Sequence, residues 1–436
     1  DEAIARGAVA VLCERALPPR GDTVPLLHAP ALRGGLGALA QRFFEHPSAH
    51  LMLCAVTGTN GKTSVAHLFA QALALLGDRA GYIGTLGAGE LSALVPLANT
   101  TPDVITIQRW LAHFRAAGCR AAALEASSHG LAQERLAGLD LFAAAFTNLG
   151  HDHLDYHRDL DDYAAAKRRL FTHPGLSRAV LNIDDALGAR LARELPPHVA
   201  QWTCSSRATP SRVRADRIRQ GESGLHFRVT LDGDSADFAT ALTGRFNVDN
   251  LLVVSALLHA CGHALDDVAA IVPRLHGVPG RAEPCGSTRR GAKVMVDFAH
   301  SPDSLAAILA TVNALGPRRL WLVFGCGGER DRSKRPLMGA VAEQGATQVI
   351  VTSDNPRAED PRAIAEDILA GMHEPAAARV ILDRAAAIRH ALDEAGPGDI
   401  VLVAGKGHET TQEQAGQRIA FSDQRHIAQV LAEQPA

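Results

Sequence analysis

Short apolar runs alternate along the chain with Ala- and Leu-rich stretches whose apolar positions recur at helical spacing. The runs contain few polar residues, which is typical of strands buried on both faces of a parallel sheet. The alternation therefore predicts an α/β fold. The main strands are expected at residues 51–56, 121–124, 143–147, 179–183, 293–297, 320–324, 348–352 and 400–404.

Breaks in this pattern divide the chain into three expected domains. A short first segment covers residues 1–48, and residues 49–278 contain the first strand–loop–helix unit. The last domain, residues 279–436, follows a Gly- and Pro-containing stretch at 277–280 that favours a hinge. Between residues 204 and 245 polar and apolar positions alternate, which predicts antiparallel strands inserted in the middle domain.

Composition argues against disorder and against large charged partners. Hydrophobic residues make up 47% and charged residues 21%, and the net charge is −3. We therefore expect neither nucleic acid nor a membrane as a partner, and no apolar run approaches the roughly 18 residues of a membrane helix. The seven cysteines form no C-x-x-C pair, which fits a reducing cytoplasm. A cytoplasmic monomer is expected, with further residues preceding Asp1.

The most specific motif is a phosphate-binding loop after the first strand, with the sequence Gly58-Thr59-Asn60-Gly61-Lys62-Thr63-Ser64. A helix is expected to follow it, so backbone N–H groups and the helix dipole would face an anion. Lys62 would reach the outer phosphates and the Thr63 hydroxyl would bind Mg²⁺. The usual spacing would put a glycine at residue 56, which is Val56, so an ordinary turn is the alternative.

Two regions carry candidate metal ligands. Glu125 follows the strand at 121–124, and a carboxylate at the end of a parallel strand can hold Mg²⁺ beside phosphates. A surface glutamate is an equally good interpretation. His and Asp side chains cluster at residues 151–157, and these hard ligands favour Mg²⁺ over zinc. A solvated polar turn is the alternative for this cluster.

The G-T-N-G-K-T sequence resembles the loop of the Mur ligases and folylpolyglutamate synthases, which use ATP to add amino acids to carboxylates. Matching motifs run from about residue 3 to the C-terminus. The resemblance implies a P-loop central domain with a parallel sheet and a Rossmann-like C-terminal α/β domain. Residues 1–48 would be the remnant of an N-terminal α/β domain that binds uridine diphosphate.

The same resemblance implies roles that spacing alone does not show. Lys167, in a Y-x-x-A-K-x-x-L-F segment, would be carbamylated by CO₂ and would act in catalysis with Lys62 and His153. The metal ligands would be Thr63, Glu125, His153 and Lys167. The nucleotide would be contacted by residues 58–64, Asn250, Arg281 and Asp297. Taken as bare residues, Arg281 and Asp297 are more often structural.

Two later motifs bear on the substrates. Asp354-Asn355-Pro356-Arg357 is similar to the D-N-P-R of family members that add meso-diaminopimelate, whose distal carboxylate suits a guanidinium. Gly405 and Glu409 would take its distal ammonium, and Arg330 would bind a carboxylate. The family usually has Asp at Glu329 and Gly at Ser333. For UDP-N-acetylmuramoyl-L-alanyl-D-glutamate the resemblance points to Thr100, Thr101, Ser127, Gln133 and Arg135.

Together these motifs imply a ligase that uses ATP and Mg²⁺ to add meso-diaminopimelate to the D-glutamyl side-chain carboxylate through an acyl phosphate, in peptidoglycan precursor synthesis. A lysine-adding or folate-type ligase is the nearest alternative. A P-loop ATPase or kinase is the second, and a catalytically silent nucleotide-binding scaffold is the third. A closing motion of the last domain is expected in the ligase.

Overall fold

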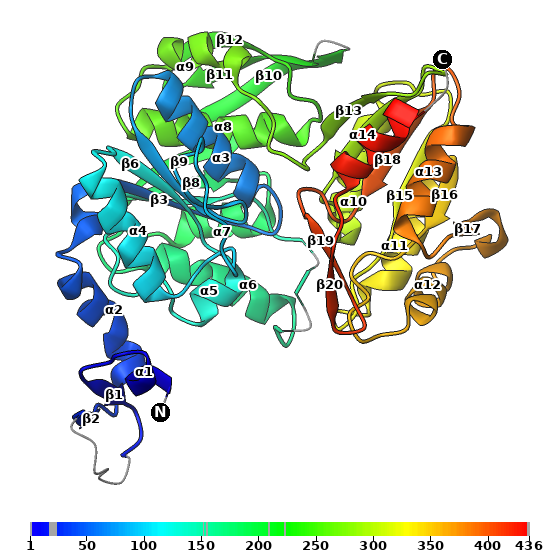
Figure 1. Ribbon diagram of the computed structural model, residues 1–436. Helices are drawn as coiled ribbons and strands as arrows, with labels where there is room; N and C mark the ends of the chain where they lie inside the picture. Colours follow the sequence, from blue (N-terminus) through cyan, green and yellow to red (C-terminus); the bar gives the residue numbers. More distant parts are fainter. Residues whose placement is uncertain are drawn as a thin grey trace.

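The computed structural model describes residues 2–16, 24–150, 152–153, 156–207, 210–221 and 224–433, except the Arg33 side chain. Figure 1 shows two α/β lobes side by side, with an N-terminal segment that projects from the larger lobe. Within the described ranges, every helix is too short or too polar to cross a bilayer.

A ten-stranded sheet forms the larger lobe, in the order β12-β11-β10-β9-β8-β7-β3-β6-β4-β5. Neighbouring strands from β10 to β4 run parallel, whereas β5, β11 and β12 pair antiparallel. The predicted parallel strands and the antiparallel strands between residues 204 and 245 are therefore confirmed. The strands are β3 (Met52–Thr57), β4 (Ala80–Gly84), β5 (Gly87–Gly89), β6 (Ala121–Glu125), β7 (Ala143–Phe146), β8 (Arg178–Asn182), β9 (Ala200–Ser205), β10 (Val213–Gly221), β11 (Gly224–Leu231) and β12 (Asp234–Thr240).

Helices cover both faces of this sheet, which explains why its strands are continuously apolar. Along β3, Cys54 and Val56 face one core, while Leu53 and Ala55 face the other. The first core contains α3 (Lys62–Leu75), α8 (Phe246–Ala260) and α9 (Leu265–Ile271). The second contains α4 (Val104–Ala116) and α7 (Ala186–Glu194), and α5 (Ser128–Ala132) and α6 (Leu160–Arg168) lie at this side.

The smaller lobe is a six-stranded sheet in the order β13-β14-β18-β15-β16-β17. All neighbours run parallel except β13, which pairs antiparallel at one edge. One face packs on α10 (Pro302–Asn313), α11 (Lys334–Gly345) and α12 (Pro361–Leu369), the other on α13 (Arg384–Glu394) and α14 (Asp423–Glu433). The strands are β13 (Glu283–Ser287), β14 (Lys293–Asp297), β15 (Leu320–Phe324), β16 (Gln348–Val351), β17 (Arg379–Val380) and β18 (Ile400–Ala404).

Two small units complete the fold. The N-terminal segment contains α1 (Glu2–Ala5), the parallel pair β1 (Val11–Cys13) and β2 (Leu26–His28), and α2 (Leu32–Phe43). The hairpin β19 (Thr411–Gln414) and β20 (Gln417–Ala420) extends from the smaller lobe and was not predicted. The expected domain boundary after residue 278 falls in the loop between β13 and the 3₁₀ helix Val272–Arg274.

Candidate active site

The phosphate loop joins the end of β3 to the start of α3. Gly58 and Gly61 have φ angles of 152° and 84°. A Cβ atom on Gly58 would lie 1.9 Å from Thr147 Oγ1, and one on Gly61 would lie 2.6 Å from Asn250 Oδ1. Only glycine fits these two positions. Val56 is a fully buried residue of β3, so the loop opens two residues later than the usual spacing expects.

The Lys62 ammonium lies folded over this loop. Its Nζ donates hydrogen bonds of 2.9 Å to both Gly58 O and Thr59 O. Burial lowers the pKa of Lys62, and the charge of Glu125 opposes that shift. The side chain therefore stands where the outer phosphates of a nucleotide would meet the loop.

Glu125 ends β6 and lies fully buried behind Thr63. Its carboxylate accepts hydrogen bonds from Thr63 Oγ1 at 2.8 Å, Thr85 N at 2.9 Å and Tyr82 OH at 2.5 Å. A carboxylate and a hydroxyl beside a phosphate loop suit Mg²⁺, which prefers few protein ligands together with phosphate oxygens. No cluster of three or more His, Cys, Asp or Glu able to hold a metal occurs within the described ranges.

Lys167, on α6, is buried against the same loop. Its Nζ donates a 2.7 Å hydrogen bond to Gly58 O and lies 4.1 Å from the centre of the Tyr163 ring. Burial, followed by the charge of Lys62, lowers the pKa of Lys167 well below its usual value. The neutral amine is the form that reacts with CO₂, so this environment fits the expected carbamate.

The structure describes only part of the His/Asp cluster, because His151, Leu154 and Asp155 lie outside the described residues. Burial lowers the pKa of His153 to about 3, so its ring is neutral and can offer a lone pair to a metal. His153 has a left-handed backbone, with φ of 58°. Its ring centre lies 6.0 Å from that of Tyr163.

Asp152 links the two lobes, a role that the sequence did not reveal. Its carboxylate lies 3.6 Å from His300 Nε2 and 3.8 Å from Lys334 Nζ, both in the smaller lobe. Burial alone would raise the pKa of Asp152, but the hydrogen bond and charge of His300 lower it overall. The ionised carboxylate thus faces the His300 ring and the Lys334 amino group across the gap between the lobes.

A second cavity, of about 160 Å³, adjoins the loop on the side of α8. Asn250, Arg281 and Asp297 meet there, although they come from distant parts of the chain. Both Asp297 oxygens accept 2.7 Å hydrogen bonds, from Ala282 N and Ala299 N. The Arg281 guanidinium lies 4.5 Å from the centre of the Phe298 ring. The cavity is lined by Asn60, Asn148, Phe246, Val253, Ala307 and Ile308, among others.

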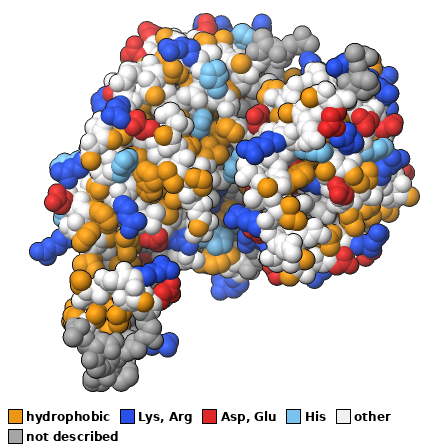
Figure 2. Space-filling model, in the orientation of Figure 1, with side chains coloured by type: hydrophobic (Ala, Val, Ile, Leu, Met, Phe, Trp, Pro, Cys, Tyr) orange, Lys and Arg blue, Asp and Glu red, His pale blue; other side chains and the backbone are white. Residues whose placement is uncertain are grey.

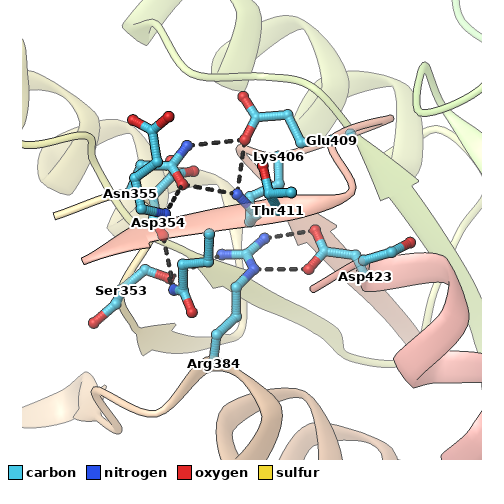
Figure 3. Close-up of polar contacts among 12 residues, drawn as sticks. Ser353, Asp354, Asn355, Arg384, Lys406, Glu409, Thr411 and Asp423 are labelled. Atoms are coloured by element: carbon cyan, nitrogen blue, oxygen red, sulfur yellow. Dashed lines mark hydrogen bonds and ion pairs between the residues drawn. The ribbon is translucent and has the colours of Figure 1, made fainter. Parts of the chain in front are cut away.

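The predicted amino-acid subsite lies in the smaller lobe, where β16 and β18 end. Asn355 Nδ2 donates a 2.8 Å hydrogen bond to Glu409 Oε2 (Figure 3). Arg357 has a left-handed backbone, with φ of 54°, and its Nη1 donates a 2.7 Å hydrogen bond to Gly328 O. Glu413, on the hairpin, places its carboxylate 3.3 Å from Arg357 Nε. Sequence analysis missed Glu413 and the buried Lys406, which lies between Asn355 and Glu409.

The residues expected to bind the sugar nucleotide occupy the opposite side of the cleft. Thr101 is fully buried, and its hydroxyl donates a 2.6 Å hydrogen bond to Glu125 O. Ser127 is the N-terminal cap of α5. The hydroxyl oxygens of Thr100 and Thr85 are hydrogen-bonded at 3.1 Å. Among the residues predicted to bind the sugar nucleotide, Gln133 alone does not line the cleft. Its Nε2 donates a 3.2 Å hydrogen bond to Tyr156 OH instead.

One cleft of about 450 Å³ connects these groups. Figure 2 shows the seam between the lobes, with Lys and Arg side chains on the smaller lobe beside it. Glu125 and Pro356 are buried and do not line the cleft, and Asn250 and Asp297 line the second cavity. The cleft is lined by Thr59, Asn60, Gly61, Lys62, Thr63, Thr100, Thr101, Ser127, Arg135, His153, Lys167, Arg281, Arg330, Asp354, Asn355, Arg357, Gly405 and Glu409.

The fold and this cleft define a P-loop nucleotide-binding enzyme whose second α/β domain faces the phosphate loop. The family model of the Mur ligase middle domain matches residues 56–258, and that of the Mur ligase glutamate ligase domain matches residues 280–407. The chain belongs to the Mur ligase family.

Individual relatives agree with this assignment. The chain is 46% identical to UDP-N-acetylmuramoyl-L-alanyl-D-glutamate--2,6-diaminopimelate ligase of Xanthomonas campestris pv. campestris, over 99% of this chain and 87% of the relative. It is 45% identical to the Xylella fastidiosa enzyme of that name, over 99% of this chain and 88% of that relative. A solved structure with that name superposes with a TM-score of 0.69 at 37% identity, covering 99% and 88% of the two chains. Folylpolyglutamate synthase of Mycobacterium tuberculosis shares the fold, with a TM-score of 0.70 at 19% identity. The match covers 85% of this chain and 92% of the synthase chain.

Proposed function

We propose that this protein is an ATP-dependent ligase that adds 2,6-diaminopimelate to the D-glutamyl side-chain carboxylate of UDP-N-acetylmuramoyl-L-alanyl-D-glutamate. The observation that carries the proposal is the shared cleft, in which Lys62 and Thr63 face Arg357 and Glu409. The names of relatives at 44–46% identity support the same substrates. We also propose residues 49–278 and 279–436 as the two domains that form the cleft, and residues 1–48 as a third.

ATP would bind with its phosphates on the loop at residues 58–64. Lys62 would exchange its bonds to Gly58 O and Thr59 O for the transferring phosphoryl group. Thr63, Glu125 and His153 would hold Mg²⁺, which would offset the phosphate charge. The second cavity, with Asn250, Arg281 and Asp297 on its walls, would take the nucleoside.

The reaction would proceed in two steps. The γ-phosphoryl group would pass to the D-glutamyl carboxylate and give an acyl phosphate and ADP. The amine of the amino acid would then attack the acyl carbon, and phosphate would leave as the amide forms. Both steps depend on positioning and on fixed charges, which the cleft supplies through Lys62, Arg330 and Arg357.

Lys167 would carry a carbamate. Its neutral amine would add to CO₂ and lose a proton, which converts a buried neutral group into an anion next to Lys62. Such an anion would help to hold the metal or position Lys62. Bound label from isotopically enriched CO₂, absent from a Lys167→Arg variant, is the expected result; equal labelling of both proteins would refute this step.

The amino acid would be held by both of its ends. The distal carboxylate would bind the Arg357 guanidinium, and the distal ammonium would bind Glu409 and the Gly405 carbonyl. Lysine has the ammonium but lacks the distal carboxylate, so it would leave Arg357 without a ligand. Thr100, Thr101, Ser127, Gln133 and Arg135 would bind or support the dipeptide of the sugar nucleotide.

We propose the cytoplasm as the setting of this reaction. All seven cysteines lie in the described part of the chain and none is in a disulfide, which fits a reducing compartment. Since one chain supplies both walls of the cleft, we propose that a monomer is active.

Release of phosphate from ATP, measured with the sugar-nucleotide dipeptide and an added amino acid, tests the proposal. Turnover should require both substrates and should be faster with diaminopimelate than with lysine. Faster turnover with lysine would refute the substrate assignment. Undiminished ATP hydrolysis without any amino acid would point to a P-loop ATPase.

A further inference from the structure

Lys406 is a fully buried lysine in the turn after β18. It stands between Gly405 and Gly407, whose φ angles are 115° and 52°. A Cβ atom on Gly405 would lie 2.5 Å from Asp354 Oδ2, and one on Gly407 would lie 2.6 Å from Phe298 Cβ. The two glycines therefore permit a turn that sends the Lys406 side chain inward.

The buried ammonium closes a ring of three polar side chains (Figure 3). Lys406 Nζ donates to Glu409 Oε2 at 2.7 Å and to Asn355 Oδ1 at 3.1 Å. Asn355 Nδ2 donates to the same Glu409 oxygen at 2.8 Å. The amide orientation of Asn355 is fixed further, since Glu413 N donates to its Oδ1 at 3.0 Å.

This ring determines what Glu409 can offer to a ligand. Its Oε2 atom accepts two hydrogen bonds, whereas Oε1 accepts none from the described residues. The Glu409 side chain is 33% exposed and lines the cleft. One oxygen is therefore available to an incoming ammonium, but the negative charge of the carboxylate is already offset by Lys406.

Neighbouring charges around the subsite are paired in the same way. Arg357 lies beside Glu413, and Arg384 makes two 2.7 Å hydrogen bonds to Asp423. Asp354 lies within the electrostatic reach of both Lys406 and Arg384. The subsite thus presents compensated charges rather than an excess of negative charge.

We propose that Lys406 is a specificity-determining positioning residue, which makes the subsite select an amine donor with a zwitterionic distal end. The inference rests on the proposed ligase function. A zwitterion can place its carboxylate on Arg357 and its ammonium on Glu409 Oε1, without changing the net charge of the subsite. A lone distal ammonium must lose its hydration opposite an anion that Lys406 already neutralises, so it binds poorly.

The test compares the ratio of kcat/KM for lysine to that for diaminopimelate in wild type and in Lys406→Met. Removing the resident cation unmasks the charge of Glu409, so the ratio should rise by about tenfold or more. The change should come from KM for the amino acids, with kcat for diaminopimelate and KM for ATP little changed. Lys406→Gln removes the same charge while keeping polar atoms, and should shift the ratio in the same direction if the Met variant folds poorly.

The double variant Lys406→Met/Glu409→Gln is the matched control. It removes the unmasked anion as well, so the gain in lysine use should disappear. An unchanged ratio in both single variants, or a gain that persists in the double variant, would overturn the inference. Wild-type turnover with diaminopimelate tests the ligase function separately, so failure of that function is recognised before any variant is compared.

Discussion

Thr63 and Glu125 are 62 residues apart in the chain, yet the threonine hydroxyl donates a 2.8 Å hydrogen bond to the glutamate carboxylate. The sheet topology explains this contact. β3 and β6 are adjacent parallel strands, so their carboxyl ends meet at one edge of the sheet. The phosphate loop follows the first strand and the carboxylate ends the second, which places a cation-binding pair beside the phosphates.

Replacement of Lys62 by alanine should abolish ATP-dependent phosphate release, by roughly 1,000-fold or more, because the loop would lose its cation at the outer phosphates. Phosphate release in a coupled assay measures the effect. Lys293→Ala, at an exposed lysine on β14, is the matched control and should retain wild-type activity. Near-normal turnover of the Lys62 variant would exclude this loop as the site of phosphoryl transfer.

Arg357→Ala should raise KM for diaminopimelate by about 100-fold, since a paired guanidinium–carboxylate contact would be lost. Glu413→Ala should raise the same KM less, because Glu413 contacts Arg357 from the hairpin but does not itself line the cleft. Glu413→Gln, which keeps an oxygen acceptor for Arg357 Nε, should recover part of the loss. A lower KM in Glu413→Ala would show that this carboxylate competes with the substrate instead.

His67, on α3, should make the protein less stable as the pH falls. Burial lowers the pKa of His67 to about 4 from its usual 6.5, so the unfolded chain takes up the proton first. The stability present above pH 6.5 is thus lost between pH 6.5 and pH 4, by about 3 kcal/mol. Urea unfolding across this range should show a shallower pH dependence for His67→Leu. Identical slopes for the two proteins would contradict the prediction.

Arg384 and Asp423 form a fully buried ion pair that joins α13 to α14. Removing one partner leaves an uncompensated buried charge, so Arg384→Met should lower the free energy of unfolding by about 3–5 kcal/mol. The double variant Arg384→Met/Asp423→Leu removes both charges and should be more stable than the single variant. Thermal or urea unfolding measures the free energy of unfolding of both variants. A double variant less stable than Arg384→Met, as expected if the two substitutions acted independently, would contradict a direct pairing.

Much of the fold could be predicted because the short continuous apolar runs of this chain are typical of buried strands in a parallel sheet. The expected strands at 293–297, 320–324 and 400–404 match β14, β15 and β18 at every residue. Those at 121–124, 143–147 and 348–352 differ by one residue at one end, and those at 51–56 and 179–183 are each shifted by one residue relative to β3 and β8. β4 was missed because two of its five residues are glycines. The β19–β20 hairpin was missed because its largely exposed strands carry little apolar alternation, and contacts with Arg357 help to fix it.

Some residues of the candidate site could be predicted from the sequence and others could not. Local motifs such as the phosphate loop point to their own chemistry, because sequence order determines the backbone turn. Partners that meet only in the folded chain are not encoded locally, as with Asp152 and His300 or Lys406 and Asn355. The two glycines around Lys406 were the one available hint, since such a turn directs its middle side chain to one side.

A crystal structure with a non-hydrolysable ATP analogue, the sugar-nucleotide dipeptide and diaminopimelate would test the shared cleft most directly. The phosphates should contact the backbone amides of residues 58–64, with the distal carboxylate of diaminopimelate on Arg357 and its distal ammonium on Glu409. Phosphates bound away from this loop, or an amino acid bound outside the cleft, would contradict the proposed function.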